Sequence, residues 1–86
     1  MSPSTALSHE ELAEVITRCA GARTDAAALR TTRPTFQDLG VDSLGLLGIV
    51  AELEQMFGIR LGDDAERCSS PDELLATTNT LLREAA

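Results

Sequence analysis

Residues 43–57 constrain the fold of this chain more than any other segment. They begin at Ser43, end just before Gly58, and contain a run of aliphatic side chains at helical spacing. At about 100° per residue, six apolar side chains fall on one side of a helix and predict a face that packs against a core. These six are Leu46, Ile49, Val50, Leu53, Met56 and Phe57. We therefore expect a helix over residues 43–57 to organise the rest of the fold.

The opposite face of this helix is also apolar. It carries Leu44, Leu47 and Ala51, and it is flanked by Glu52 and Glu54. A chain of 86 residues cannot easily bury both faces of one helix. We interpret these five residues as a docking surface for other proteins, with ordinary scattered surface side chains as the alternative.

A second helix is predicted near the start of the chain. Ser8 and Glu11 have the spacing of a capping box, and apolar residues follow at helical spacing. Gly21 can end this helix, which we place over residues 8–20. Residues 1–7 are expected to be frayed.

A capping pattern predicts the start of the last helix. Ser70 is a favourable N-cap, Pro71 suits the first helical position, and Glu73 follows at the third position. This pattern predicts a helix over residues 71–84. The acidic segment 63–68 is expected to form a short helical turn.

Residues 21–42 lack sustained periodicity and are predicted to form a long loop, a feature that is commonly functional. Phe36, Leu39 and Val41 near its end are expected to pin the loop to the core and so to fix the direction of Ser43. The predicted fold is all-α: a small antiparallel bundle of three main helices plus one short helix, forming a single domain over residues 1–86.

Ser43 is the candidate functional residue because it lies where this loop becomes a helix. Asp42 precedes it and Leu44 follows it. The first N–H groups of a helix lack internal partners, and together with the helix dipole they favour an anion at this position. The alternative is that Ser43 is only an N-cap.

Charge and cysteine content limit the classes of partner. Seven arginines, no lysine and fourteen acidic residues give a formal net charge of -7. Such a surface repels nucleic acid and anionic membranes and suits basic proteins, although solubility alone would also explain it. Cys19 and Cys68 fall at apolar positions and are expected to be buried free thiols, with no metal site. No apolar stretch approaches the roughly 20 residues that span a bilayer, and residues 1–8 lack signal-peptide features, so a cytoplasmic protein is expected.

Motifs along the whole chain resemble the acyl carrier protein family. They are Phe36-Gln-Asp-Leu-Gly-Val-Asp-Ser-Leu44, Glu52-Leu-Glu54, Phe57-Gly-Ile-Arg-Leu61, Asp63-Asp64 and Ser70-Pro-Asp-Glu-Leu-Leu75. Arg18-Cys-Ala-Gly21 and the ending Asn79-Thr-Leu-Leu-Arg-Glu-Ala-Ala86 are most similar to the discrete carriers of type II (aromatic) polyketide synthases. Leu39-Gly-Val-Asp42 favours an acyl carrier over a peptidyl carrier.

The resemblance implies a carrier and not an enzyme. A 4'-phosphopantetheine arm would be esterified to Ser43, between Asp42 and Leu44, and would hold acyl or poly-β-keto chains as thioesters in polyketide and antibiotic biosynthesis. The implied partners of this monomer are a phosphopantetheinyl transferase, the ketosynthase/chain-length factor, an acyltransferase, a ketoreductase and cyclases. The alternatives are a carrier of fatty-acid synthesis, a peptidyl carrier, and a helical interaction module that carries nothing.

A carried chain would need shelter from water and from premature cyclisation. The inner face of helix 43–57 is expected to oppose the last helix, and aliphatic side chains between them could part to admit the chain. The predicted chain pocket consists of Leu46, Ile49, Val50, Leu53, Leu75, Thr78 and Leu82, with Asn79 offering a hydrogen bond to chain carbonyls unless it is merely solvated.

Overall fold

In the computed structural model, which describes residues 6–85, helix α1 spans His9–Ala20. Ser8 Oγ accepts from Glu11 N–H at 3.1 Å, while Glu11 Oε1 accepts from Ser8 N–H at 3.0 Å. Gly21 ends the helix with a φ of 70°, which glycine adopts without steric cost. The predicted capping box and helix end are confirmed. Leu7 just before the cap is buried, so the expected frayed start does not reach it; residues 1–5 lie outside the described residues.

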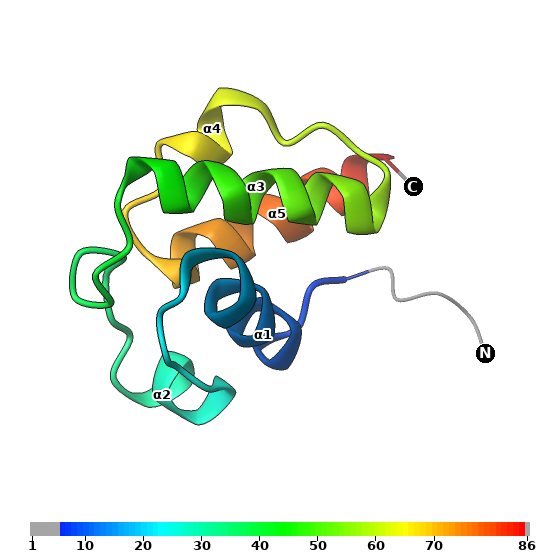
Figure 1. Cartoon of the computed structure of the whole chain (residues 1–86). Coiled ribbons are helices and arrows are strands. Elements are labelled where there is room, and N and C mark those ends of the chain that lie inside the picture. Colours follow the sequence, from blue (N-terminus) through cyan, green and yellow to red (C-terminus); the bar gives the residue numbers. More distant parts are fainter. Residues whose placement is uncertain (1–5, 86) are drawn as a thin grey trace.

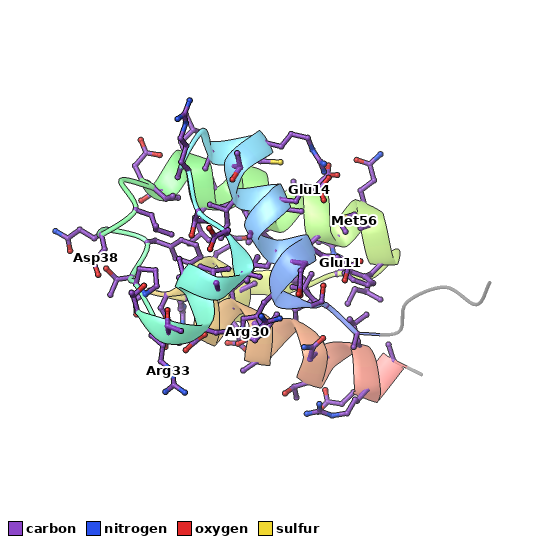
Figure 2. All side chains as sticks on the ribbon, turned by 90° about the horizontal axis from the view of Figure 1, so that it is seen from below. Glu11, Glu14, Arg30, Arg33, Asp38 and Met56 are labelled. Atoms are coloured by element: carbon purple, nitrogen blue, oxygen red, sulfur yellow. The ribbon has the colours of Figure 1, made fainter. Side chains whose placement is uncertain are left out.

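Helix α2 (Ala26–Thr31) lies within the segment that the sequence predicts as a loop. Asp25 caps it by accepting from Ala28 N–H at 2.8 Å, and its one buried side chain, Leu29, enters the core. Arg30 pairs with Glu10 of α1 at 2.9 Å; Figure 2 shows Arg30 beneath α1. The prediction of a continuous loop is wrong here because a helix of six residues with one buried side chain shows no periodicity.

Helix α3 (Ser43–Phe57) has the predicted bounds. Four of its six expected core residues are buried, and Phe57 packs partly buried against them. Met56 is not buried: it is 41% exposed, and Figure 2 labels it near the end of α3. It lies at the edge of the apolar stripe in the last turn, where the core no longer covers the helix. The buried four are Leu46, Ile49, Val50 and Leu53.

The chain then forms a short helix, α4 (Gly62–Glu66), and the last helix, α5 (Pro71–Ala85). Ser70 Oγ accepts from Glu73 N–H at 3.2 Å, as the predicted cap requires. The expected short helical turn and last helix are therefore present.

The helices surround one core (Figure 1), and they do not all approach one another equally. Close backbone contacts join α1 to α2, α3 and α5, and join α4 to α3 and α5. Helices α3 and α5 have few or no such contacts, although both turn buried side chains toward the same core. In Figure 1, α5 passes behind α3 at an angle. Side chains rather than close backbones therefore fill the space between α3 and α5. No helix within residues 6–85 is both long and apolar enough to cross a bilayer.

Candidate functional site

The start of α3 presents a free hydroxyl. Asp42, not Ser43, is the N-cap: its Oδ1 accepts from Gly45 N–H at 2.8 Å, and its carbonyl accepts from Leu46 N–H at 2.9 Å. Ser43 occupies the first helical position, is exposed, and its hydroxyl has no hydrogen-bond partner among residues 6–85. The alternative in which Ser43 is only a cap is therefore wrong. An aspartate directly before a helix is a favourable cap, so the sequence already held this signal.

The preceding loop fixes the direction in which Ser43 points. Phe36 and Val41 are 4% and 8% exposed, and Leu39 packs partly buried against the core. Val41 N–H donates to the Phe36 carbonyl at 2.8 Å, and Phe36 N–H donates to the Ser69 carbonyl at 2.9 Å. The loop is thereby tied both to itself and to the segment before α5, as the three apolar residues predict.

A cavity of about 320 Å³ opens beside Ser43. Asp42, Ser43 and Glu66 contribute polar groups to its wall, while Leu46 and Cys68 contribute apolar surface. Leu46 is also part of the hydrophobic core, so the cavity reaches from the exposed hydroxyl to the inner face of α3. Cys68 was not predicted as a site residue, because nothing in the local pattern places it near Ser43.

The Cys68 thiol is held in a protonated state. Its Sγ donates to the Asp64 carbonyl at 3.3 Å and lies 3.7 Å from Thr77 Oγ1. Burial raises the pKa of the Cys68 thiol above its ordinary value. Because the thiolate is the nucleophile, this thiol is poorly reactive. Cys19, the other free cysteine, is half-buried rather than buried as expected.

The predicted docking surface has an exposed apolar centre. Leu44 is 77% exposed, Leu47 is 46% exposed, and Ala51 is exposed as well. The two flanking carboxylates are not free. Glu52 pairs with Arg18 of α1 at 2.6 Å, and Glu54 Oε2 accepts from Leu61 N–H at 2.8 Å.

Glu54 therefore departs from the role expected of it. Its carboxylate holds the turn after α3, where Gly58 N–H also donates to the Glu54 carbonyl at 2.8 Å. A contact seven residues away along the chain cannot be read from helical spacing. Removing the Glu54 carboxylate would leave the Leu61 N–H without its acceptor, whereas removing the Glu52 carboxylate would break only its pair with Arg18.

The residues of the predicted chain pocket separate into two groups. All four on α3 are buried, and on α5 Thr78 is fully buried. Leu75 and Leu82 are only half-buried, whereas Leu74, which was not assigned to the pocket, is fully buried. The core face of α5 is therefore Pro71, Leu74 and Thr78; it shares Thr78 with the predicted set, but Leu74 takes the place expected for Leu75.

Asn79 is neither solvated nor directed at a chain. Its Oδ1 accepts from Leu7 N–H at 2.6 Å, and its Nδ2 donates to the Leu7 carbonyl at 3.1 Å. Both ends of the amide are thus used to tie the segment before α1 to α5. The expectation that Asn79 offers a bond to chain carbonyls is wrong for this arrangement, because those groups are already paired.

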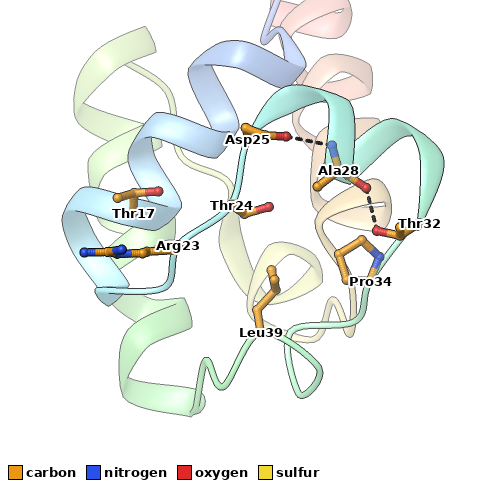
Figure 3. Close-up of a pocket in the computed structure, with 8 residues that line it drawn as sticks. All are labelled: Thr17, Arg23, Thr24, Asp25, Ala28, Thr32, Pro34 and Leu39. Atoms are coloured by element: carbon orange, nitrogen blue, oxygen red, sulfur yellow. Dashed lines mark hydrogen bonds between the residues drawn. The ribbon is translucent and has the colours of Figure 1, made fainter.

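A second cavity, of about 510 Å³, lies between α1, α2 and the loop that follows α2 (Figure 3). Thr17 of α1, Thr24, and Thr32 at the end of α2 line it together with Leu39. The Thr32 hydroxyl donates to the Ala28 carbonyl at 2.7 Å, whereas Thr24 Oγ1 is buried without a partner within residues 6–85. Ser43 does not line this cavity.

Known proteins match both the sequence and this geometry. Residues 10–77 match the family described as "Phosphopantetheine attachment site". A probable acyl carrier protein of Streptomyces halstedii is 45% identical over 82 residues, which cover 94% of this chain and 89% of the relative. The actinorhodin polyketide synthase acyl carrier protein of Streptomyces coelicolor is 38% identical over 86 residues, covering 96% and 99% of the two chains.

Solved structures match in the same way. A solution structure of the actinorhodin carrier from Streptomyces coelicolor with a 3,5-dioxohexyl chain, a triketide mimic, has a TM-score of 0.78 at 37% identity. The match covers 94% of this chain and 96% of that one. The holo form of the actinorhodin carrier has a TM-score of 0.76 at 35% identity, with 94% and 96% covered.

Proposed function

This chain belongs to the acyl carrier protein family, and we propose that Ser43 is the residue that bears its phosphopantetheine arm. The protein is a carrier that tethers acyl and poly-β-keto intermediates as thioesters for polyketide synthase enzymes. One observation supports Ser43 above the other serines of the described residues 6–85: Asp42 caps α3, which leaves the Ser43 hydroxyl exposed and without a partner among those residues. Ser8 and Ser70, by contrast, use their hydroxyls as caps.

The surroundings of Ser43 fit a phosphodiester. The backbone N–H groups of Ser43 and Leu44 have no hydrogen-bond partner within the described part of the chain, and both lie in the first turn of α3. Unpaired N–H groups at a helix N-terminus favour an anion, as does the helix dipole. The arm, when bound, supplies a terminal thiol on which chains are held as thioesters. The protein's part is to orient the arm, to shelter the chain and to be recognised.

The attachment site is tested by the mass of the intact protein. The unmodified protein is incubated with coenzyme A, Mg²⁺ and a promiscuous phosphopantetheinyl transferase. Wild type is expected to gain the mass of one arm, and Ser43→Ala is expected to gain none. Ser70→Ala is the matched control, because it removes a hydroxyl from the start of another helix and should still be loaded. A full arm on Ser43→Ala would end the assignment.

We propose that the cavity beside Ser43 is the entrance for the carried chain. It leads past Leu46 to the buried side chains of α3 and α5, whose backbones are not in close contact. Apolar walls tend to close over an empty space, so the path need not be open before a chain enters. The residues proposed to contact the chain are Leu46, Ile49, Val50, Leu53 and Thr78, with Leu75 and Leu82 at the edge.

We propose that Leu44, Leu47 and Ala51 form the centre of the docking surface, with Glu52 beside it. These residues lie on the outer face of the helix that begins at Ser43, so a partner held there can reach the arm. An exposed apolar patch with a carboxylate at its edge suits a partner with a basic rim. The proposed partners are the phosphopantetheinyl transferase, the ketosynthase/chain-length factor, an acyltransferase, a ketoreductase and cyclases.

The chain is further proposed to be a single carrier domain that acts as a monomer in the cytoplasm and catalyses no reaction of its own. Support comes from the names of its relatives, which describe carriers and not enzymes. Sedimentation of the arm-bearing protein would reveal any dimer.

A further inference from the structure

Thr78 has the one hydroxyl of α5 that is fully buried and without a partner within residues 6–85. Its residue exposure is 0%, and it shares the core face of the helix with Pro71 and Leu74. Threonines in helices commonly donate to the carbonyl four residues back, as Thr17 does to Ala13 at 3.0 Å. The Thr78 hydroxyl makes no such bond. A buried polar group without a partner destabilises the fold unless something else satisfies it.

The position of Thr78 connects it to the path from Ser43. Leu46 lines the cavity that contains Ser43 and also belongs to the hydrophobic core. Leu74, one turn from Thr78, belongs to that same core. Thr78 belongs to the buried face of α5, so a chain that passes Leu46 and enters between α3 and α5 would approach the helix that carries the unpaired hydroxyl.

We propose that Thr78 selects for oxygenated chains by donating a hydrogen bond from its hydroxyl to a keto group of the carried chain; this inference rests on the proposed function. A β-keto chain has carbonyl oxygens along its length, which accept hydrogen bonds and lose water when buried. Pairing one of them with Thr78 satisfies two buried groups at once. A fully reduced chain of the same length has no oxygen to offer at that depth, so it leaves the hydroxyl unpaired.

The test compares two chains on two proteins. Wild type and Thr78→Val are loaded on Ser43 with a 3,5-dioxohexanoyl or a hexanoyl pantetheine, both joined through a stable amide. Thermal midpoints are then measured against the arm-bearing protein without a chain. In wild type the dioxohexanoyl chain should raise Tm more than the hexanoyl chain does, by about 4–8 °C for one hydrogen bond in a domain of this size. In Thr78→Val, which keeps the side-chain shape, the two chains should act alike.

Two controls keep the result specific. Thr80→Val removes an exposed hydroxyl from the same helix and should retain the difference between the chains. Thr78→Ser keeps the hydroxyl and should retain at least part of that difference. In addition, ¹³C at the keto carbons should shift downfield in wild type relative to Thr78→Val, a signal that does not depend on stability.

Several outcomes would overturn the inference. A chain-free Thr78→Val protein that melts well below wild type would mean that the hydroxyl already has a partner, such as a buried water. Equal effects of the two chains on wild type, or a difference that persists in Thr78→Val, would mean that no keto group is recognised there. The proposed function is judged separately by mass: failure of both chains to load on Ser43 counts against it, whereas normal loading without discrimination counts only against Thr78.

Discussion

At the start of α3, one side chain caps the helix and the neighbouring side chain presents a free hydroxyl. Asp42 satisfies the Gly45 N–H, and Ser43 is therefore free to carry a substituent. If serine were both cap and attachment point, loading would remove the cap. With the arm on Ser43, as proposed, this division of roles would allow the helix to keep the same cap in the loaded and unloaded forms.

This division predicts that substitutions at Asp42 and at Ser43 change the free energy of unfolding by different amounts. Asp42→Ala should lower the free energy of unfolding by about 1 kcal/mol, because it removes the cap. Asp42→Asn should keep most of the stability, since asparagine caps nearly as well. Ser43→Ala should be close to neutral because its hydroxyl makes no bond within residues 6–85. Urea denaturation of the unmodified protein measures all three, and a Ser43→Ala cost equal to that of Asp42→Ala would refute the division.

At the scale of elements, two glycines of α3 differ in what surrounds them. A Cβ on Gly45 would lie 3.1 Å from Val41 Cγ1 and 3.3 Å from Ala20 Cβ, where α1 meets α3. A Cβ on Gly48 would meet only the Cys19 carbonyl oxygen, at 3.8 Å, an ordinary contact. Gly45 thus belongs to the packing between α1 and α3 and not to the docking surface.

Alanine substitutions at Gly45 and Gly48 serve as controls for each other. Alanine in a helix interior is favoured over glycine by about 1 kcal/mol. Gly48→Ala should therefore stabilise the protein by about that amount in urea denaturation. Gly45→Ala should gain less or should destabilise, because the added methyl crowds Val41 and Ala20. Equal stabilisation by the two substitutions would show that the contact between α1 and α3 can accommodate an added methyl group.

Another prediction at the scale of elements concerns how the stability of the fold changes as the pH falls. Glu73 accepts hydrogen bonds from the backbone N–H and the hydroxyl of Ser69 at the start of α5. Both bonds hold the pKa of Glu73 below its ordinary value, and the bond from the hydroxyl has the larger effect. A lowered pKa in the folded state means that the charged form stabilises the fold above the unfolded-state pKa, and that this stabilisation is lost as pH falls through the folded-state pKa. Glu73→Gln should therefore be less stable than wild type at neutral pH, and the gap should narrow in acid. A gap independent of pH would mean that the charge is not responsible.

The elements that the sequence predicts well are those defined by local signals. Caps and 3.6-residue periodicity place α1, α3 and α5 to within a residue, since each signal spans only one turn or one face. Helix α2 was missed because it has a single buried side chain. Long-range contacts explain the remaining differences. The bond between Asn79 and Leu7 joins residues far apart in sequence, and the bond between Glu54 and Leu61 closes a turn, so neither leaves a periodic trace.

The candidate site was predictable for a related reason. Ser43 and Asp42 lie at the start of a helix, and a helix start can be recognised from the residue types that occur there. The pocket was only partly predictable, because choosing between Leu74 and Leu75 requires the rotation of α5 about its axis. That rotation is set by packing against α1 and α4, which the pattern of one helix does not record.

At the scale of the whole molecule, the net charge of -7 acts on stability and on recognition in opposite directions. Like charges repel within the folded chain, and salt screens that repulsion. Attraction to a basic partner speeds encounter, and salt weakens it. Raising NaCl from about 20 mM to about 0.5 M, across which the Debye length falls severalfold, should therefore raise Tm by a few degrees while it slows loading by the transferase. Calorimetry and a timed mass assay on the same samples measure both.

The control for this salt prediction separates overall charge from charge at the docking surface. Glu52→Lys and Glu84→Lys change the net charge equally, but only Glu52 lies on α3, the helix that carries the proposed docking surface, whereas Glu84 is exposed near the end of α5. Loss of the exposed pair with Arg18 should cost at most about 1 kcal/mol, so Glu52→Lys should remain folded. At low salt it should load several-fold more slowly than Glu84→Lys, and the two rates should converge at high salt. Equal rates at low salt would mean that the transferase responds to total charge and that its contact surface lies elsewhere.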